Sequence, residues 1–449
     1  MYYSKEKLDT LLESLINKYD LPGASVGVYQ DGVSIHSSYG YLEDNYKVPY
    51  SLNSIFRVGC VVKVFHAAQI MALKDQGKID IGEPITNYLP QLKSFKTVTT
   101  RHLLSHSSGL PGNLADVTEK NVLERLNILD EQEVLLFEPG TNCSYSSLGY
   151  LIVAKLIEEL SGETWEENLN TRIFEPLDID CTQLESNRDT KVFAPEGKIH
   201  YEGEWLKPHL KHNRMLPSEG GTLALSTKDL LAFCRMHIDK GLSQKGVRIL
   251  SKESVKEMSS FYASLPGKWP LGGQSLSIGW LRYQDGSLGF SGNGLGNHCF
   301  LKINPDNGSC ITMATNYHNS SLLFSELYET IFSDSKNNDY QSNVNIKENT
   351  NKNLTVESLS GSYYCGQRKV ILSNIGGKLG VKSSVYHQLL QTFGYDENET
   401  NRVFQEYRLE GMQLIVNVCG FLFEYSLIDM NGDGDISYLW DGMCLFKKR

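Results

Sequence analysis

Residues 54–73 read SIFRVGCVVKVFHAAQIMAL and place Cys60 three residues before Lys63, where an apolar helical pattern begins. Residues one turn apart share a face of a helix, so the thiol and the amine are predicted to be neighbours. The positive end of the helix dipole and the lysine both favour the thiolate, the nucleophilic form of cysteine. The alternative interpretation of Cys60 is a small buried residue at a helix start, and this segment alone leaves both open.

Strands are predicted before and after a helical middle of the chain. Strands at 24–30 and 33–39 flank Asp31-Gly32, a dipeptide typical of two-residue hairpins. Further strands are predicted at 277–283, 299–303 and 309–316. Helical spacing of apolar residues predicts helices at 8–19, 61–77, 147–161, 164–173, 227–240 and 320–332. This order predicts an α+β fold in which helices pack on one antiparallel sheet.

The length of 449 residues predicts more than one domain. Residues 334–353 are rich in Asn, Ser and Lys, which predicts a linker between a domain at 1–333 and a small all-β barrel at 354–449. Asp429–Asp435 begins like a calcium-binding EF-hand loop, but Trp440 stands where that loop needs Glu. A hairpin turn between strands at 421–428 and 436–446 is predicted instead.

Composition excludes several classes of partner. The net charge of −10, without a local Lys/Arg cluster, argues against binding nucleic acid or anionic membranes, and no run of 18 apolar residues predicts a membrane span. The nine cysteines are scattered singly, and the N-terminus has no secretory pattern, so free thiols in the cytoplasm are predicted. His102 and His106 lie four apart on a predicted short helix, but Leu103 replaces the Glu of a zinc hydrolase motif. Neither a metal nor a cofactor is predicted.

Five further segments follow residues 54–73 in order. They are KIDIGEPITNYLP, VTTRHLLSHSSGLPG, EPGTNCSYSSLGYLIVAKLIEELSG, FEPLDI and PSEGGTLALSTKDLLAF. Together they resemble the serine β-lactamase and penicillin-binding-protein superfamily, in its class C and esterase-like branch, over roughly residues 8–332. The resemblance implies a β-lactamase-like domain, with an antiparallel sheet flanked by helices and a helical subdomain. The C-terminal domain, a lipocalin-like barrel, adds a resemblance to penicillin-binding-protein-type thioesterases.

The family's motifs are Ser-x-x-Lys, Tyr-x-Asn, and Lys or His followed by Thr or Ser and Gly. Here they read Cys60-Val-Val-Lys63, Tyr145-Ser-Ser147 and Phe290-Ser291-Gly292. The resemblance implies that Cys60 is the nucleophile, that Lys63 is its general base and that Tyr145 is the second proton-transfer group. It also implies an oxyanion hole made by the backbone N–H groups of Cys60 and Asn293. The residues implied for substrate binding are Ser147, Phe290, Ser291 and Gly292.

Lys63 and Tyr145, the implied proton-transfer pair, are retained although the nucleophile has changed from Ser to Cys. This pattern favours an active site with altered chemistry over a site that has lost its activity. An acyl group on Cys60 would be a thioester, which favours attack by an amine over water more than an ester does. We therefore expect a cysteine acyltransferase or thioesterase that forms amides or cyclises peptides in natural-product biosynthesis. Its donor would be a thioester of a carrier protein or coenzyme A, and its acceptor an amine. An esterase or amidase of small acyl substrates and a catalytically inactive binding protein are the alternatives; the sequence leaves the oligomeric state open.

Overall fold

The computed structural model divides the chain into two compact units, each assembled from segments distant in the sequence. The first unit contains Met1–Ile81, Val153–Phe261 and Ser277–Asn338; the second contains Gly82–Ile152, Tyr262–Leu276 and Asp339–Arg449. The structure describes residues 3–42, 48–114, 117–118, 120–129, 134–179, 199–201, 204–206, 223–267, 269, 272–294, 297–317, 320–332, 354–366, 368–376, 378–383, 407–410, 412–418, 421–428 and 436–449. The predicted linker at 334–353 lies outside the described residues.

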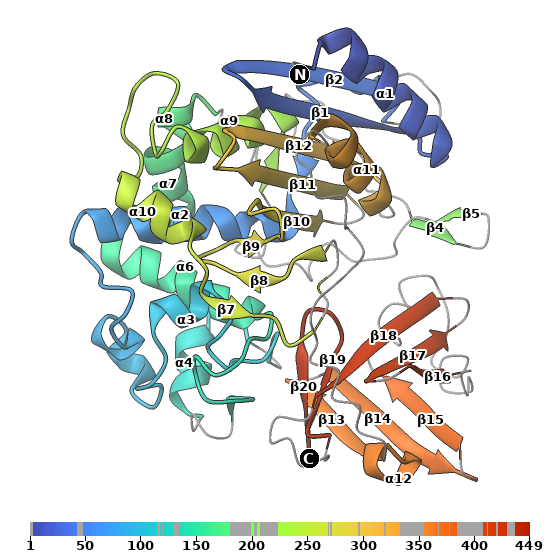
Figure 1. Cartoon of the computed structure of the whole chain (residues 1–449). Helices are drawn as coiled ribbons and strands as arrows, with labels where there is room; N and C mark the ends of the chain where they lie inside the picture. The colour runs from blue at the N-terminus through green and yellow to red at the C-terminus, as the bar shows by residue number, and fades with distance from the viewer. Residues whose placement is uncertain are drawn as a thin grey trace. The chain divides into compact units, whose positions relative to one another are not determined.

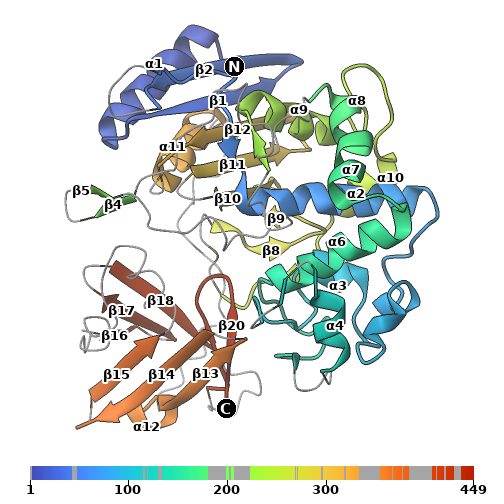
Figure 2. The same ribbon diagram turned by 180° about the vertical axis from the view of Figure 1, so that it is seen from behind.

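The core of the first unit is an antiparallel sheet with helices on both faces (Figures 1 and 2). Its strands in spatial order are β2 (Val33–Gly40), β1 (Gly23–Gln30), β12 (Ser309–Thr315), β11 (Asn297–Asn304), β10 (Leu288–Gly294) and β9 (Leu281–Arg282). Helices α1 (Lys5–Lys18) and α11 (Ser321–Phe332) lie on one face, and α9 (Thr227–Ile238) lies on the other. This arrangement confirms the predicted α+β fold.

Side-chain contacts agree with this assignment of the two faces. On α11, Tyr328 lies over the Lys302 ammonium of β11, with its ring centroid 3.7 Å away. On α9, the carbonyl of Thr227 accepts a hydrogen bond from the Thr312 hydroxyl of β12 at 3.0 Å. Lys302 pairs with Ile311, the neighbour of Thr312, and adjacent strand residues point to opposite faces. The sheet is therefore covered on both sides, which explains why β11 and β12 are buried throughout.

The hairpin predicted at Asp31-Gly32 is confirmed. Asp31 and Gly32 have φ values of +52° and +82°, the left-handed values that a two-residue hairpin turn requires. The helix predicted near the N-terminus is also confirmed as α1, which begins where the Ser4 side chain accepts the Lys7 N–H. The residues that α1 buries recur at helical spacing and are Leu8, Leu12, Leu15 and Ile16.

The central helix of the first unit is α2 (Val62–Asp75), which buries every residue from Val62 to Leu73. Its neighbour Gly279 explains why the strand predicted at 277–283 is wrong. Only β9, at Leu281–Arg282, and β8 (Ser275–Leu276) form here. Gly279 has a φ of +79°, and a Cβ at this position would collide with the Cβ of Ala67 on α2. The chain bends where it passes the helix, so a continuous strand cannot form.

The helix predicted at 147–161 is confirmed as α6 (Ser147–Ser161). The helix predicted at 164–173 is longer than expected, because α7 (Trp165–Leu169) continues into a π-helical turn, η4 (Asn170–Phe174), and then α8 (Glu175–Leu177). Further short helices are η2 (Ile85–Asn87), η3 (Pro90–Leu92), α3 (Thr100–Leu104), α4 (Val122–Asn127) and α10 (Lys252–Ser259). Short antiparallel pairs join β3 (Phe56–Arg57) to β6 (Ala224–Leu225), β4 (Ile199–Tyr201) to β5 (Glu204–Leu206), and β7 (Ala263–Ser264) to β8.

The second unit contains an all-β sheet near the C-terminus, preceded by the short helix α12 (Val356–Leu359). In spatial order its strands are β15 (Lys378–Ser383), β14 (Arg368–Ile375), β13 (Gly361–Cys365), β20 (Leu445–Lys448), β19 (Tyr438–Trp440), β18 (Phe421–Ile428), β17 (Gln413–Val418) and β16 (Tyr407–Glu410). This sheet agrees with the predicted small C-terminal barrel. Figure 1 draws its strands in orange and red.

One prediction in this sheet is wrong. Residues 436–446 do not form a single strand but split into β19 and β20, with a turn at residues 441–444. The Asp441 side chain accepts the N–H groups of Met443 at 3.0 Å and Cys444 at 2.6 Å, which stabilises the turn. The EF-hand-like residues 429–435 lie outside the described residues, but Ile428 pairs with Tyr438, so the predicted hairpin of β18 and β19 is confirmed.

No helix in the described part of the chain is long and apolar enough to cross a membrane.

Candidate active site

Cys60 and Lys63 lie where a 3-10 turn meets the central helix of the first unit. Cys60 belongs to η1 (Gly59–Val61), and Lys63 belongs to the first turn of α2, which confirms the predicted helix start. The N-terminal end of a helix carries partial positive charge, which favours an anion beside it. Cys60 is half-buried, whereas Lys63 is completely buried. Cys60 is therefore partly exposed, while the Lys63 amine is shielded from bulk water.

The backbone of β10 lies directly against the segment that carries Cys60. A Cβ added to Gly292 would stand 2.7 Å from the Cys60 nitrogen, and a Cβ added to Gly59 would stand 2.7 Å from the Asn293 nitrogen. Gly59 also has a φ of +54°, which glycine adopts without strain. Both positions require glycine because the two backbone segments are in contact. The predicted oxyanion-hole residues, Cys60 and Asn293, thus come from backbone segments in contact.

The third predicted motif places an apolar side chain near this contact. Phe290 is only 5 % exposed and pairs with Leu301 of β11. Phe290 and Gly292 share one face of β10, because alternate strand residues point the same way, and half-buried Ser291 points to the other face. The position where the family resemblance implies a cation therefore carries a buried phenyl ring.

Tyr145 and Ser147 belong to the second unit, at the start of α6. Tyr145 is buried and Ser147 is half-buried. The Ser146 hydroxyl accepts the Gly149 N–H at 2.9 Å and donates to the Pro111 carbonyl at 2.7 Å. Ser146 is therefore the N-cap of α6.

His106 supports the Tyr145 segment, a role that the sequence had not indicated. Its Nδ1 accepts the Ser146 N–H at 3.1 Å, and its carbonyl accepts the Ser144 N–H at 2.8 Å. The ring centroids of His106 and Tyr145 are 4.7 Å apart. A histidine whose Nδ1 accepts a hydrogen bond keeps its proton on Nε2, so this contact favours the neutral ring.

The two histidines of the His102–His106 pair serve different backbone segments. Helix α3 ends at Leu104, and His106 has a left-handed φ of +54°, so the prediction of both on one helix is wrong. His102 instead completes a capping box, with its Nδ1 accepting the Thr99 N–H at 3.2 Å. Burial lowers the pKa of His102. Among the residues that the structure describes, no group of three or more His, Cys, Asp or Glu side chains could hold a metal.

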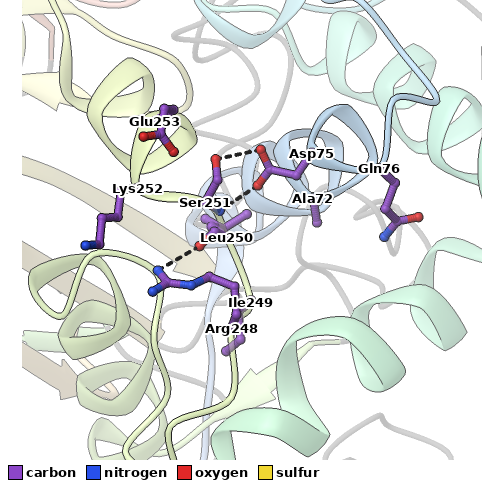
Figure 3. Close-up of a pocket in the computed structure, with 9 residues that line it drawn as sticks. All are labelled: Ala72, Asp75, Gln76, Arg248, Ile249, Leu250, Ser251, Lys252 and Glu253. Atoms are coloured by element: carbon purple, nitrogen blue, oxygen red, sulfur yellow. Dashed lines mark hydrogen bonds between the residues drawn. The ribbon is translucent and has the colours of Figure 1, made fainter.

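A surface pocket of about 520 Å³ lies in the first unit, beside the end of α2 (Figure 3). There the Asp75 carboxylate accepts the Ser251 N–H at 2.6 Å, the Ser251 hydroxyl at 2.7 Å and the Ser254 hydroxyl at 2.7 Å. Arg248 donates to the Leu250 carbonyl at 3.3 Å. These bonds connect the start of α10 to the end of α2. We therefore assign the polar groups of this pocket a structural role.

The sheet with its central helix, and the three altered motifs, define a β-lactamase-like protein. The family model described as Beta-lactamase matches residues 8–332, so the chain belongs to the β-lactamase family. The chain is 27 % identical over 331 residues to penicillin-binding protein 4 of Amycolatopsis lactamdurans, covering 71 % of this chain and 87 % of that protein.

Solved structures extend the likeness of fold. SurE, solved with D-Leu, is similar with a TM-score of 0.76 at 20 % identity, covering 99 % of each chain. The D-amino acid amidase of Ochrobactrum anthropi SV3, solved with L-phenylalanine amide, is similar with a TM-score of 0.59 at 20 % identity. That likeness covers 73 % of this chain and 98 % of the amidase. At these identities the solved structures support the fold alone.

Proposed function

We propose that this protein is an enzyme that forms an acyl-thioester on Cys60 and passes the acyl group to an amine. One observation carries the proposal: the half-buried Cys60, just before α2, lies on a backbone segment that is in contact with β10 at Gly292. In this arrangement a nucleophile and two backbone segments with N–H groups lie within one compact unit. A carbonyl carbon bound to Cys60 would hold its oxygen near those donors.

The first half of the reaction transfers the acyl group from a thioester donor to Cys60. Lys63, in its neutral form, takes the Cys60 proton, and the thiolate attacks the donor carbonyl. The tetrahedral oxyanion is stabilised by the N–H groups of Cys60 and Asn293. The donor's thiol then leaves as a thiolate that regains a proton from Lys63. The product is an acyl group joined to the Cys60 sulfur.

The second half transfers the acyl group to an amine. The amine nitrogen attacks the thioester carbonyl, Tyr145 relays the amine's proton to the departing Cys60 sulfur, and the free thiol is restored. Attack by water instead would give hydrolysis, the reaction of the esterase or amidase alternative. We propose that amines are preferred, because a thioester reacts with amines in preference to water more than an ester does.

The substrates in this proposal are uncharged near position 290. Phe290 is buried and cannot bind a substrate carboxylate, so an apolar or amide-bearing acyl group fits better than a free acid. Ser147, Ser291 and Gly292 would contact the acyl chain. Because SurE was solved with D-Leu and a second similar fold is a D-amino acid amidase, donors with a D-residue are the first to try. A carrier-protein or coenzyme A thioester is the proposed donor, and the cytoplasm, where thiols stay reduced, is the proposed location.

Mass spectrometry of the intact protein after incubation with peptidyl thioesters tests the proposal. We expect one acyl adduct on the wild type, no adduct on Cys60→Ala, and faster release by an added amine than by water. Cys60→Ala should keep the melting temperature of the wild type within a few degrees. Release only to water would favour the esterase or amidase, and the absence of an adduct with every activated donor would favour an inactive binding protein.

A further inference from the structure

Tyr145 is held by a part of the chain that lies outside the matched family region. Its backbone N–H donates to the Met443 carbonyl at 2.8 Å, and its carbonyl accepts the Cys444 thiol at 3.6 Å. The hydroxyl oxygen of the preceding Ser144 accepts the Leu445 N–H at 3.0 Å. Met443, Cys444 and Leu445 are consecutive: the first two lie in the turn between β19 and β20, and Leu445 is the first residue of β20. We call these three residues the Tyr145 clamp.

The remainder of the Tyr145 segment is bonded within the family region. Ser144 and Ser146 donate their N–H groups to His106, and Ser147 donates its own to the Gly112 carbonyl. The Tyr145 N–H and carbonyl differ from these groups, because their partners Met443 and Cys444 belong to the clamp and lie outside the family region. The residues on either side of Tyr145 are thus fixed by the family region, whereas the backbone of Tyr145 itself is bonded to the clamp. We therefore expect the orientation of Tyr145 to depend on the clamp.

A half-buried carboxylate shapes the clamp. Asp441 accepts the N–H groups of Met443 and Cys444, as described above, and its other oxygen lies 3.7 Å from the Arg368 guanidinium of β14. Arg368 also donates to the Cys444 sulfur at 3.4 Å. These contacts hold Met443 and Cys444 in a tight turn just before β20, with the Met443 carbonyl toward the Tyr145 N–H. Loss of the Asp441 acceptor would release that turn.

The same sheet also backs the aromatic ring of Tyr145. Trp269 meets Tyr145 edge-on with ring centroids 6.1 Å apart, and Trp440, the last residue of β19, packs on Trp269 at 6.0 Å. Gly267 lies so close to Trp440 that an added Cβ would collide with its ring. The phenol is therefore confined by His106, which belongs to the matched family region, and by Trp269, which is backed by the C-terminal sheet.

From these contacts we infer that the Tyr145 clamp of the C-terminal sheet positions Tyr145 for proton transfer in acyl transfer. This inference rests on the proposed function, since it assigns Tyr145 the role stated there. The clamp residues do not touch substrate in this mechanism; they act through Tyr145. The C-terminal sheet is then a working part of the enzyme, because the proton-transfer side chain depends on it for its place.

A double-mutant cycle in the full-length protein tests the inference. Asp441→Ala should lower kcat for aminolysis at least about tenfold, with KM for the thioester donor within about twofold of the wild type. In a Tyr145→Phe background the same change should lower kcat less than about twofold, because the phenol that the clamp positions is already absent. Losses that multiply in the double variant would overturn the inference.

Matched variants separate positioning from general damage to the sheet. Asp441→Asn keeps an oxygen that can accept both N–H groups and should restore most of the rate. Tyr363→Phe removes a buried bond to the Leu359 carbonyl in the same sheet, and its aminolysis rate should equal that of the wild type. If Asp441→Ala does not fold, Ser144→Ala, which removes the acceptor of the Leu445 N–H, takes its place in the cycle.

Amide hydrogen exchange makes the test independent of the reaction. The Tyr145 amide should exchange at least about tenfold faster in Asp441→Ala than in the wild type or in Tyr363→Phe. Unchanged protection would overturn the inference even if catalysis is impaired. Should the wild type form no adduct on Cys60 with any thioester, the proposed function fails, and the exchange result alone decides whether the clamp holds Tyr145.

Discussion

Replacing Gly292 by alanine perturbs the contact between β10 and Cys60 on which the proposed oxyanion hole depends. The added Cβ would stand 2.0 Å from the Val58 carbonyl oxygen and 2.7 Å from the nitrogens of Cys60 and Val61, whereas non-bonded carbon contacts normally lie at about 3.5 Å or more. The two segments must therefore separate by more than about 1 Å, or the strand must rotate. Either movement shifts the Asn293 N–H relative to the Cys60 N–H.

The expected loss is large because such donors act only when well placed. Removal of one oxyanion donor costs about 10²–10³ in rate, and a displacement of about 1 Å can cost about 10². We expect acylation of Cys60 in Gly292→Ala to be about 100-fold slower than in the wild type. Stability should fall by about 1–3 kcal/mol, as for other overpacked sites. The assay is the rate of adduct formation with a peptidyl thioester, normalised to the folded fraction by circular dichroism.

Gly289 supplies the matched control on the same strand. A Cβ there would stand 2.9 Å from the Tyr283 ring and 3.0 Å from the Leu301 carbonyl oxygen, on the face of β10 opposite to Gly292. Gly289→Ala should lose stability while keeping the acylation rate within about threefold of the wild type. A folded Gly292→Ala enzyme that acylates at the wild-type rate would refute the placement of the oxyanion hole, and equal slowing in both variants would point to strain in the strand.

Two further predictions concern charge. Burial lowers the pKa of His237 to about 3, so this histidine is neutral in the folded protein and binds a proton below pH 6.5 only after unfolding. Stability should fall by about 2 kcal/mol between pH 6.5 and 5 on this account, and urea unfolding of His237→Leu should lack that part of the decline; identical pH slopes would contradict it. Benzylpenicillin should be a poor substrate, because with Phe290 its carboxylate loses a charge-assisted hydrogen bond worth about 1.5–3 kcal/mol. Penicillin turnover compared with thioester aminolysis measures this, and fast penicillin hydrolysis without aminolysis would contradict it.

Elements with a strong local pattern were predicted correctly from the sequence. The helix at Ser147–Ser161 and the hairpin at Asp31-Gly32 depend on periodicity and on backbone angles that neighbouring residues control. The start of α2 at Val62, directly after the turn that contains Cys60, was also predicted from a local pattern. The resemblance to the β-lactamase family over residues 8–332 could also be detected from the sequence, because altered versions of its motifs occur in the family's order along the chain.

Errors arose where a distant part of the chain controls a local bend. Gly279 interrupts a predicted strand because Ala67 of α2 stands against it, and nothing near position 279 contains that information. The turn after Trp440 is a different case. Asp441-Gly442 is a dipeptide typical of turns, so a local signal was present and was missed within an apolar run.

The residues of the candidate site were named from the sequence alone, whereas the groups that hold them in place were visible only in the folded chain. Side-chain chemistry identifies a thiol, an amine and a phenol wherever they stand. The partners of Tyr145 are the carbonyl of Met443 and the thiol of Cys444, and the contact beside Cys60 is the bare backbone of Gly292. Every residue carries a backbone N–H or carbonyl of nearly the same kind, so no sequence pattern marks the one that will bond. Tertiary structure makes that choice, because only packing decides which backbone groups meet.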